Sequence, residues 1–253
     1  MGTKFTQKAT SSKFLQERIK LNKNATNNFD HWSINCIPNI KINSKILDLG
    51  CGTGKQIDTF SDFLTKKCKY YGCDISKESI ELIKENYSNK PKLTLFNDSF
   101  DNINEFTNKK FDLIYSFYAL YYTNNLYKLL QNIYSHLKKD GVLWIVMPYK
   151  NTNHEIFTLL NQIYKIDSKV MYSIDGFSND VIGYSSKIGF KNIDISLFEN
   201  KIEFNKKKDL LTYIENTTFY EKKYAKDINE IITRNFNTNF QLTKEVISIK
   251  LTK

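Results

Sequence analysis

Arginine is nearly absent from this chain, although the chain is strongly basic. Its 253 residues hold 37 Lys plus Arg against 27 Asp plus Glu, a formal net charge of +10, but Arg occurs only at Arg18 and Arg234. Arg is the residue that reads bases and phosphates through paired hydrogen bonds. The excess Lys is therefore attributed to solvated surfaces, and a nucleic-acid partner is not expected.

The four cysteines lack the spacing of a metal site. Cys36, Cys51, Cys68 and Cys73 contain no C-x-x-C pair, and no cluster of histidines lies near them. This arrangement argues against a zinc site and against a disulfide framework. We expect no metal, and we expect reduced thiols, which are typical of intracellular proteins.

Long apolar runs are also missing. No stretch has the length and hydrophobicity needed to span a bilayer, and the polar segment 1–21 lacks the apolar core of a signal peptide. The sequence therefore predicts a cytoplasmic location and no membrane association.

What the chain does contain is an alternation of short apolar runs and helical patterns. This alternation predicts βαβ units and an α/β fold with a parallel sheet. The strands are expected at Lys45–Leu49, Lys69–Cys73, Leu93–Phe96, Phe111–Phe117, Val142–Met147, Lys191–Leu197 and Val246–Leu251.

Helices are expected between these strands. One is expected over Gln56–Leu64, one begins after Ser76, one starts at Leu126 and stops at Asp140-Gly141, and one is led by Ser178. The regular order is interrupted by two insertions of helical character, at 148–177 and 205–234, and is preceded by a helical segment, 1–42.

The segment Lys45–Lys55 is the most informative motif. An apolar strand leads through Asp48 into Gly50, Gly52 and Gly54, where glycine permits positive φ angles and the close approach of a ligand. A dinucleotide fingerprint would place its third glycine at Lys55. A NAD-dependent dehydrogenase is thus the weaker interpretation of this turn.

Polar residues follow the next three strands as well. Asp74 lies about twenty residues beyond the glycines, where an acid accepts hydrogen bonds from ribose hydroxyls. Asp98 follows the third strand, and Ser116 ends the fourth. Because the carboxyl ends of parallel strands meet at one edge of a sheet, these side chains are expected to line a single ligand site.

Together these residues resemble motif I and the following strand ends of the class I S-adenosylmethionine (SAM)-dependent methyltransferases. The similarity covers about 43–198 and is to small-molecule enzymes of the ubiquinone/menaquinone, malonyl-carrier-protein, trans-aconitate and juvenile-hormone-acid types. It implies a Rossmann-like, seven-stranded, mostly parallel sheet with an antiparallel C-terminal strand, in one domain, 1–253, with a helical cap and two lids. The cofactor-binding residues that it implies are Asp48, Gly50, Cys51, Gly52, Gly54, Asp74, Ile75, Asp98, Ser99 and Ser116.

In the resembled family the residue at Asp98 contacts the adenine amino group, and Asp48 is suited to the ammonium group of SAM through water. Enzymes that methylate nucleobase amino groups carry an N/D-P-P-Y loop after the fourth strand. This chain has Ser116-Phe117-Tyr118-Ala119 there instead, which argues against that substrate.

The methyl acceptor is less well defined. His154, after the fifth strand, is the candidate catalytic base, whereas His31 is a candidate at the cofactor entrance and His136 is expected to be exposed. Tyr118, Tyr121 and Tyr149 are expected to bind substrate, with ring faces available to a cation.

We therefore expect methyl transfer from SAM to an O or N atom of a small molecule or a peptide-like natural product. An RNA or protein methyltransferase and a non-catalytic SAM-binding subunit are the alternatives. A monomer or a homodimer is expected.

Overall fold

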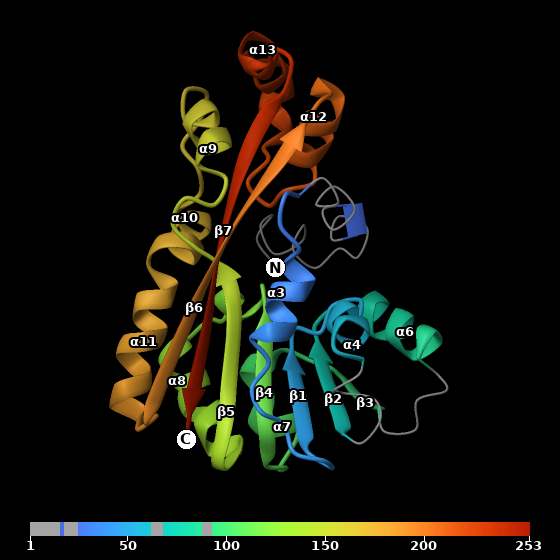
Figure 1. Cartoon of the computed structure of the whole chain (residues 1–253), viewed down its shortest axis with the longest axis vertical. Coiled ribbons are helices and arrows are strands. Elements are labelled where there is room, and N and C mark those ends of the chain that lie inside the picture. Colours follow the sequence, from blue (N-terminus) through green and yellow to red (C-terminus); the bar gives the residue numbers. More distant parts are fainter. Residues whose placement is uncertain (1–15, 18–24, 62–67, 88–92) are drawn as a thin grey trace. The chain divides into compact units, whose positions relative to one another are not determined.

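The computed structural model describes residues 16–17, 25–61, 68–87 and 93–253 (Figure 1). The chain divides into two compact units, each built from separate segments. Unit 1 comprises Met1–Phe29, Pro148–Gly176 and Phe198–Val246, and unit 2 comprises Asp30–Met147, Phe177–Leu197 and Ile247–Lys253.

A seven-stranded sheet runs through the described chain in the order β3-β2-β1-β4-β5-β7-β6. The predicted α/β fold with a mostly parallel sheet is confirmed, because β1 pairs in parallel with β2 and β4, and the same holds for β2 with β3 and for β4 with β5. The strands are β1 Lys45–Leu49, β2 Lys69–Asp74, β3 Leu93–Asn97, β4 Phe111–Phe117, β5 Leu137–Pro148, β6 Asn192–Phe204 and β7 Phe240–Thr252.

The last strand runs against its neighbours, as the resemblance implies. Figure 1 shows the arrow of β7 pointing opposite to those of β5 and β6. The pairing agrees, since the Lys253 N–H donates to the Gly141 carbonyl at 3.0 Å and the Tyr149 N–H donates to the Glu245 carbonyl at 2.9 Å. Both β6 and β7 are longer than predicted and supply residues to both units.

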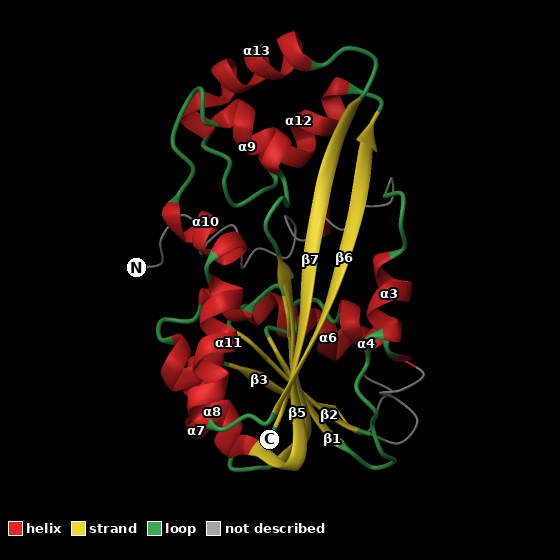
Figure 2. Cartoon of the chain, turned by 60° about the vertical axis from the view of Figure 1, so that its left-hand side comes forward, coloured by secondary structure: helices red, strands yellow, loops and turns green. Residues whose placement is uncertain are grey.

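Helices cover both faces of the sheet within unit 2. Figure 2 shows α3, α4 and α6 on one face and α7, α8 and α11 on the other. The predicted cap of α6 is confirmed, since the Ser76 hydroxyl accepts from the Ser79 N–H. The bounds are α3 Phe29–Asn35, α4 Lys55–Thr59, α6 Lys77–Asn86, η2 Phe100–Asn102, α7 Ile103–Phe106, η3 Leu120–Tyr122, α8 Leu126–His136 and α11 Phe177–Ile188.

The predicted end of α8 is wrong. The helix ends at His136, and β5 begins at Leu137, which pairs with Phe111 of β4. Asp140, with φ of 61°, and Gly141 form a kink inside the strand, where a Cβ on Gly141 would lie 3.0 Å from two backbone carbonyl oxygens. The Asp140-Gly141 pair, which is typical of a helix end, therefore lies at a kink within a strand in this protein.

The expected exposure of His136 is also wrong, because its side chain is buried. Its Nδ1 lies 2.8 Å from the Asn132 carbonyl oxygen, and its Nε2 lies 3.0 Å from the Thr107 carbonyl oxygen. The two neighbouring lysines suggested a solvent-exposed face, but the ring turns inward to these carbonyls.

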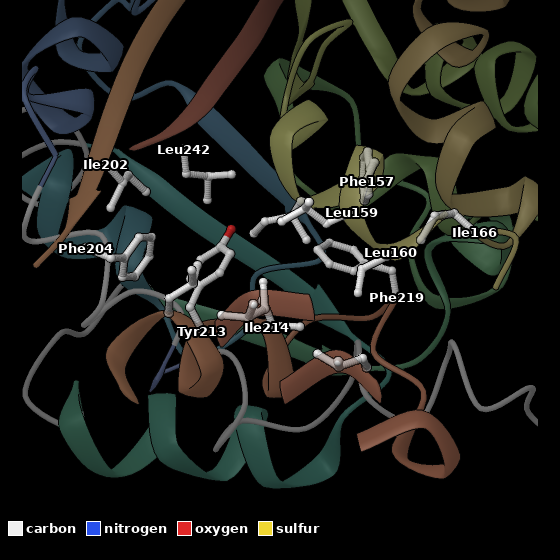
Figure 3. Packing of buried hydrophobic residues seen from close by; sticks show 14 of the residues in the cluster. Phe157, Leu159, Leu160, Ile166, Ile202, Phe204, Tyr213, Ile214, Phe219 and Leu242 are labelled. Atoms are coloured by element: carbon white, nitrogen blue, oxygen red, sulfur yellow. The ribbon is translucent and has the colours of Figure 1, made fainter. Parts of the chain in front are cut away.

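Unit 1 has a hydrophobic core of its own. Figure 3 shows Phe157 and Leu160 from α9 close to Phe219, and Tyr213 and Ile214 beside them. The helical character predicted for both insertions is thus observed. The bounds are α9 His154–Leu160, α10 Ser168–Asp175, α12 Lys207–Glu215, η4 Lys222–Tyr224 and α13 Ala225–Asn235.

The N-terminal part of the predicted cap is described only from residue 25, apart from residues 16–17. Within unit 1, Ala25 forms an antiparallel bridge with Ile202 of β6. The rest of the cap and the end of the predicted helix Gln56–Leu64 lie outside the described residues. The division into one domain, a cap and two lids stays a prediction.

Candidate cofactor site

The glycine turn lies in unit 2, between the carboxyl end of β1 and the start of α4. Gly50, Gly52 and Gly54 all have positive φ, as predicted, with values of 82°, 51° and 85°. A Cβ on Gly50 would lie 2.3 Å from the Cβ of Ala119, which follows β4. Glycine is therefore required at position 50 both by backbone conformation and by the close approach of the β4 loop.

Asp74 at the end of β2 binds this turn. Its Oδ2 accepts from the Gly52 N–H at 2.8 Å, and its Oδ1 accepts from the Ser76 N–H at 2.8 Å. Burial raises the pKa of Asp74, and these two hydrogen bonds oppose that rise. Each carboxylate oxygen retains acceptor capacity, which suits a ribose with two neighbouring hydroxyls.

Beside Asp74, the side chain of Ile75 is 59% exposed although it is large and apolar. An exposed apolar surface beside a hydrogen-bonding acid is suited to the ring of a bound nucleoside. Asn97 supports this loop, since its Nδ2 donates to the carbonyl oxygens of Asp74 and Ile75 at 3.0 and 3.1 Å. The sequence prediction missed Asn97, which is the last residue of β3.

Asp98 is held by its own loop. Its Oδ1 accepts from the Ser99 N–H at 2.7 Å and from Asn102 Nδ2 at 2.9 Å. The Ser99 hydroxyl in turn accepts from the Asp101 N–H at 3.2 Å. The Asp98 N–H donates to the Asp74 carbonyl at 3.2 Å, so the ends of β2 and β3 are joined at the predicted site.

Asp48 is almost entirely buried, with 1% of its surface exposed. Its Oδ2 accepts from the Tyr70 hydroxyl at 2.8 Å. Burial raises the pKa of Asp48 to about 7, and the hydroxyls of Tyr70 and Tyr115 partly oppose this rise. The partner Tyr70 was missed, although strand alternation places it two residues from Gly72, on the same face of β2.

Two further predicted cofactor residues lie within the packing of the turn. The Ser116 hydroxyl is buried and donates to the Leu49 carbonyl at 2.7 Å, which ties β4 to the end of β1. The thiol of Cys51 is buried, and its Sγ would lie 3.0 Å from a Cβ on Gly72. Their contact with a cofactor stays a prediction.

Three predicted acceptor-side residues lie in unit 2. Tyr118 has φ of 54° and is 38% exposed. The ring of Tyr121 is 6.2 Å from that of Phe177 at an edge-on angle. His31 is exposed on α3, and the neighbouring residue Asp30 forms a 2.8 Å ion pair with Lys55 at the start of α4. This pair brings the first turn of α3 beside the glycine turn.

Tyr149 and His154 belong to unit 1. The Tyr149 ring lies 4.9 Å from the Lys150 ammonium group. His154 is half-exposed, with its Nδ1 at 3.0 Å from the Asn151 carbonyl oxygen and 3.4 Å from Glu155 Oε2. Since both neighbours are acceptors, neutral His154 carries its proton on Nδ1 and keeps the lone pair on Nε2.

The site thus consists of a turn of three glycines and an acid that binds this turn. Both lie at the carboxyl ends of parallel strands. The family described as "Methyltransferase domain" matches residues 46–141, from β1 into β5. Residues 46–141 are therefore assigned to a methyltransferase domain. The matched segment contains every predicted cofactor residue, from Asp48 to Ser116.

Curated relatives agree with this assignment. The chain is 28% identical over 170 residues to the "Putative methyltransferase 235L" of Invertebrate iridescent virus 6, over 67% of this chain and 58% of that protein. It is 22% identical over 166 residues to juvenile hormone acid O-methyltransferase of Bombyx mori, over 61% of this chain and 59% of that enzyme. The chain thus spans about three fifths of the length of these relatives.

Solved structures share the fold at low identity. The YcgJ protein from Bacillus subtilis matches with a TM-score of 0.64 at 16% identity, over 88% of this chain and 97% of that one. Phosphoethanolamine N-methyltransferase 2 of Haemonchus contortus, solved in complex with SAM, matches with a TM-score of 0.59 at 14% identity, over 96% of this chain and 57% of that one. The methyltransferase domain therefore has the architecture of its family.

Proposed function

We propose that this chain transfers a methyl group from SAM to an O or N atom of a small molecule or a peptide-like natural product. The observation that carries the proposal is Asp74, which is bound to the Gly52 and Ser76 amides and lies next to the exposed Ile75. This arrangement offers an acid for a ribose and an apolar surface for a base, without the third glycine of a dinucleotide site.

Each predicted cofactor residue has a proposed role, and that of Asp48 is to face the ammonium group of SAM through water. Asp74 accepts hydrogen bonds from the ribose hydroxyls, and Ile75 packs against the adenine. Asp98 and the backbone of Ser99 recognise the adenine edge. The methionine part of SAM binds along the open backbone of the turn. The residues that contact it are Gly50, Cys51, Gly52, Gly54 and, at the end of β4, Ser116.

Methyl transfer is an in-line displacement at the sulfonium carbon, and it depends chiefly on alignment of the two reactants. An acceptor that carries a proton also needs a base. His154 is proposed for this role because its Nε2 lone pair is the available one. Tyr118, Tyr121, Tyr149 and His31 are proposed to bind the acceptor.

The proposal of a small-molecule acceptor is supported by the relatives whose names describe methylation of such compounds. The segments 148–177 and 205–234 are proposed to select the acceptor. Within the described part of the chain, no helix has the length and apolar character required to cross a membrane. The cytoplasmic location and the monomeric or homodimeric state remain predictions.

Calorimetric titration with SAM, S-adenosylhomocysteine and NAD tests the cofactor. We expect both SAM and S-adenosylhomocysteine to bind, and Asp74→Asn to weaken SAM binding at least about tenfold, because a charged hydrogen bond contributes about 1.5–3 kcal/mol. Glu78→Gln, at an exposed acid on α6, is the matched control and should bind as the wild type does. Binding of NAD without SAM would contradict the proposal.

Release of S-adenosylhomocysteine in the presence of a panel of carboxylic acids, phenols and amines tests the acceptor. For an acceptor that is turned over, His154→Ala should lower kcat by about 10²–10⁴-fold if the residue is the base. Tyr118→Phe should raise the acceptor KM more than the SAM dissociation constant, with Tyr127→Phe, at a 39% exposed tyrosine, as the control. Near wild-type turnover in His154→Ala would remove that residue from the mechanism.

A further inference from the structure

A row of side chains crosses the sheet of unit 2 directly beneath the glycine turn. Asp48 of β1 is in register with Gly72 of β2 and with Tyr115 of β4. Residues in register on parallel strands point to the same face of a sheet, and so do residues two apart on one strand. Tyr70, two residues before Gly72, therefore shares the face of Asp48 and Tyr115.

This row forms a closed cluster around one carboxyl group. Asp48, Tyr70 and Tyr115 have 1%, 5% and 0% of their surface exposed. The Tyr70 hydroxyl donates to Asp48 Oδ2 at 2.8 Å. The buried Tyr115 hydroxyl also faces this carboxyl and opposes the rise of its pKa, although it forms no hydrogen bond of ordinary geometry with any residue that the structure describes. Gly72 leaves room for the cluster, since a Cβ there would lie 3.1 Å from Tyr70 Cε1.

Among the residues that the structure describes, the groups that influence the Asp48 carboxyl include no compensating cation. The groups that influence its carboxyl are the Tyr70 and Tyr115 hydroxyls, from β2 and β4, and the Asp74 carboxylate at the end of β2. The thiols of Cys51 in the turn and Cys73 of β2 also interact with it. None of these described groups is positively charged. A buried carboxyl with no cationic neighbour is costly to ionise, and a bound cation would favour its charged form.

SAM brings such a cation to the turn, because it carries a sulfonium and an ammonium group. We propose that Tyr70 and Tyr115 position Asp48 as a buried proton-carrying group, so that binding of the cationic cofactor at the glycine turn releases a proton from Asp48 to solvent. The proposal rests on the proposed function, because it takes SAM as the ligand of this turn. Tyr70 and Tyr115 act through Asp48 and are positioning residues.

The balance of protons gives the size of the effect. Burial raises the pKa of Asp48 to about 7, so about half of the free protein carries this proton at pH 7. Complete ionisation on binding then releases about half a proton per SAM at pH 7. The same linkage makes SAM binding about fivefold weaker at pH 6 than at pH 7.

The experiment is calorimetric titration of the full chain with SAM at pH 7 in buffers of different ionisation enthalpy, which counts the protons released. The wild type should release about half a proton. Asp48→Asn should release none from this site, and its SAM affinity should lose the fivefold change between pH 6 and pH 7. Tyr70→Phe removes a donor to the charged form and should raise the count toward about 0.9 proton, for a rise of about one unit in the pKa of Asp48.

Tyr71→Phe is the matched control, because Tyr71 is the next residue of β2, is also buried, and packs against Phe111 on the opposite face. It should leave the proton count unchanged. SAM binding without proton release, or with equal release in wild type and Asp48→Asn, would overturn this inference and leave the proposed function intact. If the wild type does not bind SAM, the proposed function itself fails, and if Asp48→Asn does not fold, the Tyr70→Phe count decides.

Discussion

At the scale of single residues, Gly50 joins a backbone requirement to a packing requirement. Its φ of 82° favours glycine, and the Cβ of Ala119 occupies the place of a side chain. The sequence pattern predicted the first property. The second required the structure, because Ala119 is 69 positions away along the chain and approaches only when β4 pairs with β1.

Gly50→Ala is therefore expected to destabilise the fold by more than about 1 kcal/mol, the cost of positive φ for a residue with a Cβ, and to reduce SAM binding. Thermal unfolding and calorimetry measure the two effects. Gly183→Ala is the matched control, because Gly183 lies within α11 with no atom within 4 Å of an added Cβ. Its helical position should make alanine stabilising by about 0.5–1 kcal/mol. Equal behaviour of the two variants would contradict the role given to Gly50.

Asp48 makes stability depend on pH. Its pKa is raised from 3.8 to about 7 in the folded protein. The folded state therefore binds a proton that the unfolded state has lost, so this contribution to stability is present below pH 3.8 and is lost as pH rises through about 7. Between pH 5 and pH 8 the loss amounts to about 2–3 kcal/mol.

Asp48→Asn should remove this dependence. Relative to the wild type, the variant should gain about 2–3 kcal/mol in its free energy of unfolding between pH 5 and pH 8. Urea unfolding of both proteins at the two pH values measures the difference. A constant difference would mean that Asp48 titrates at the same pH in the folded and unfolded states.

At the scale of elements, β6 shows how polar side chains attach a neighbouring segment. In unit 1, the buried Asn200 accepts from the Thr26 hydroxyl at 3.1 Å and from the Asn27 N–H at 2.8 Å, and its amide donates to the Asn27 carbonyl at 3.0 Å. One side chain thus joins residues 26–27 to the strand.

Asn200→Ala should cost about 1–3 kcal/mol, because it leaves buried polar groups without partners. Amide exchange at Thr26 and Asn27 should become faster. Lys201→Ala, at the next and exposed residue, is the control, since the Lys201 backbone carbonyl that accepts from Thr26 is retained. Unchanged exchange in Asn200→Ala would show that the backbone contacts suffice.

Element types could be predicted from local patterns, while element ends could not. The helix-stop signal Asp140-Gly141 lies inside β5, because pairing of Leu137 with Phe111 ends α8 earlier. Likewise β6 and β7, which are neighbours in the sheet, extend beyond their apolar cores. Tertiary pairing overrides local propensity at such boundaries.

At the scale of the whole molecule, the chain has two compact units with separate cores. The predicted cofactor residues from Asp48 to Ser116 belong to unit 2, and the cluster around Leu160 belongs to unit 1. The predicted SAM-binding residues and the core of unit 1 therefore do not share residues.

Leu160→Ala should lower the free energy of unfolding by about 2–5 kcal/mol, because Leu160 is fully buried. At a temperature where the variant is folded, its SAM dissociation constant should stay within about twofold of the wild type, since the predicted cofactor residues belong to the other unit. Calorimetry and denaturant unfolding measure both quantities. Leu197→Ala, at a leucine that is 60% exposed, should change stability by less than about 0.5 kcal/mol. A SAM affinity lost together with the core would show that the two units act as one.

The sequence by itself determined the α/β fold, the parallel strands and the glycine turn, because apolar periodicity and positive-φ glycines are local properties of the chain. It also predicted that Asp74 and Asp98 lie near the carboxyl ends of their strands, because the apolar runs locate those strands. Only the tertiary structure showed that Tyr70 donates to Asp48, that Asn97 supports the Asp74 loop and that His136 is buried. Those contacts join residues from different strands and helices, and no local pattern encodes which side chains meet once the sheet has formed.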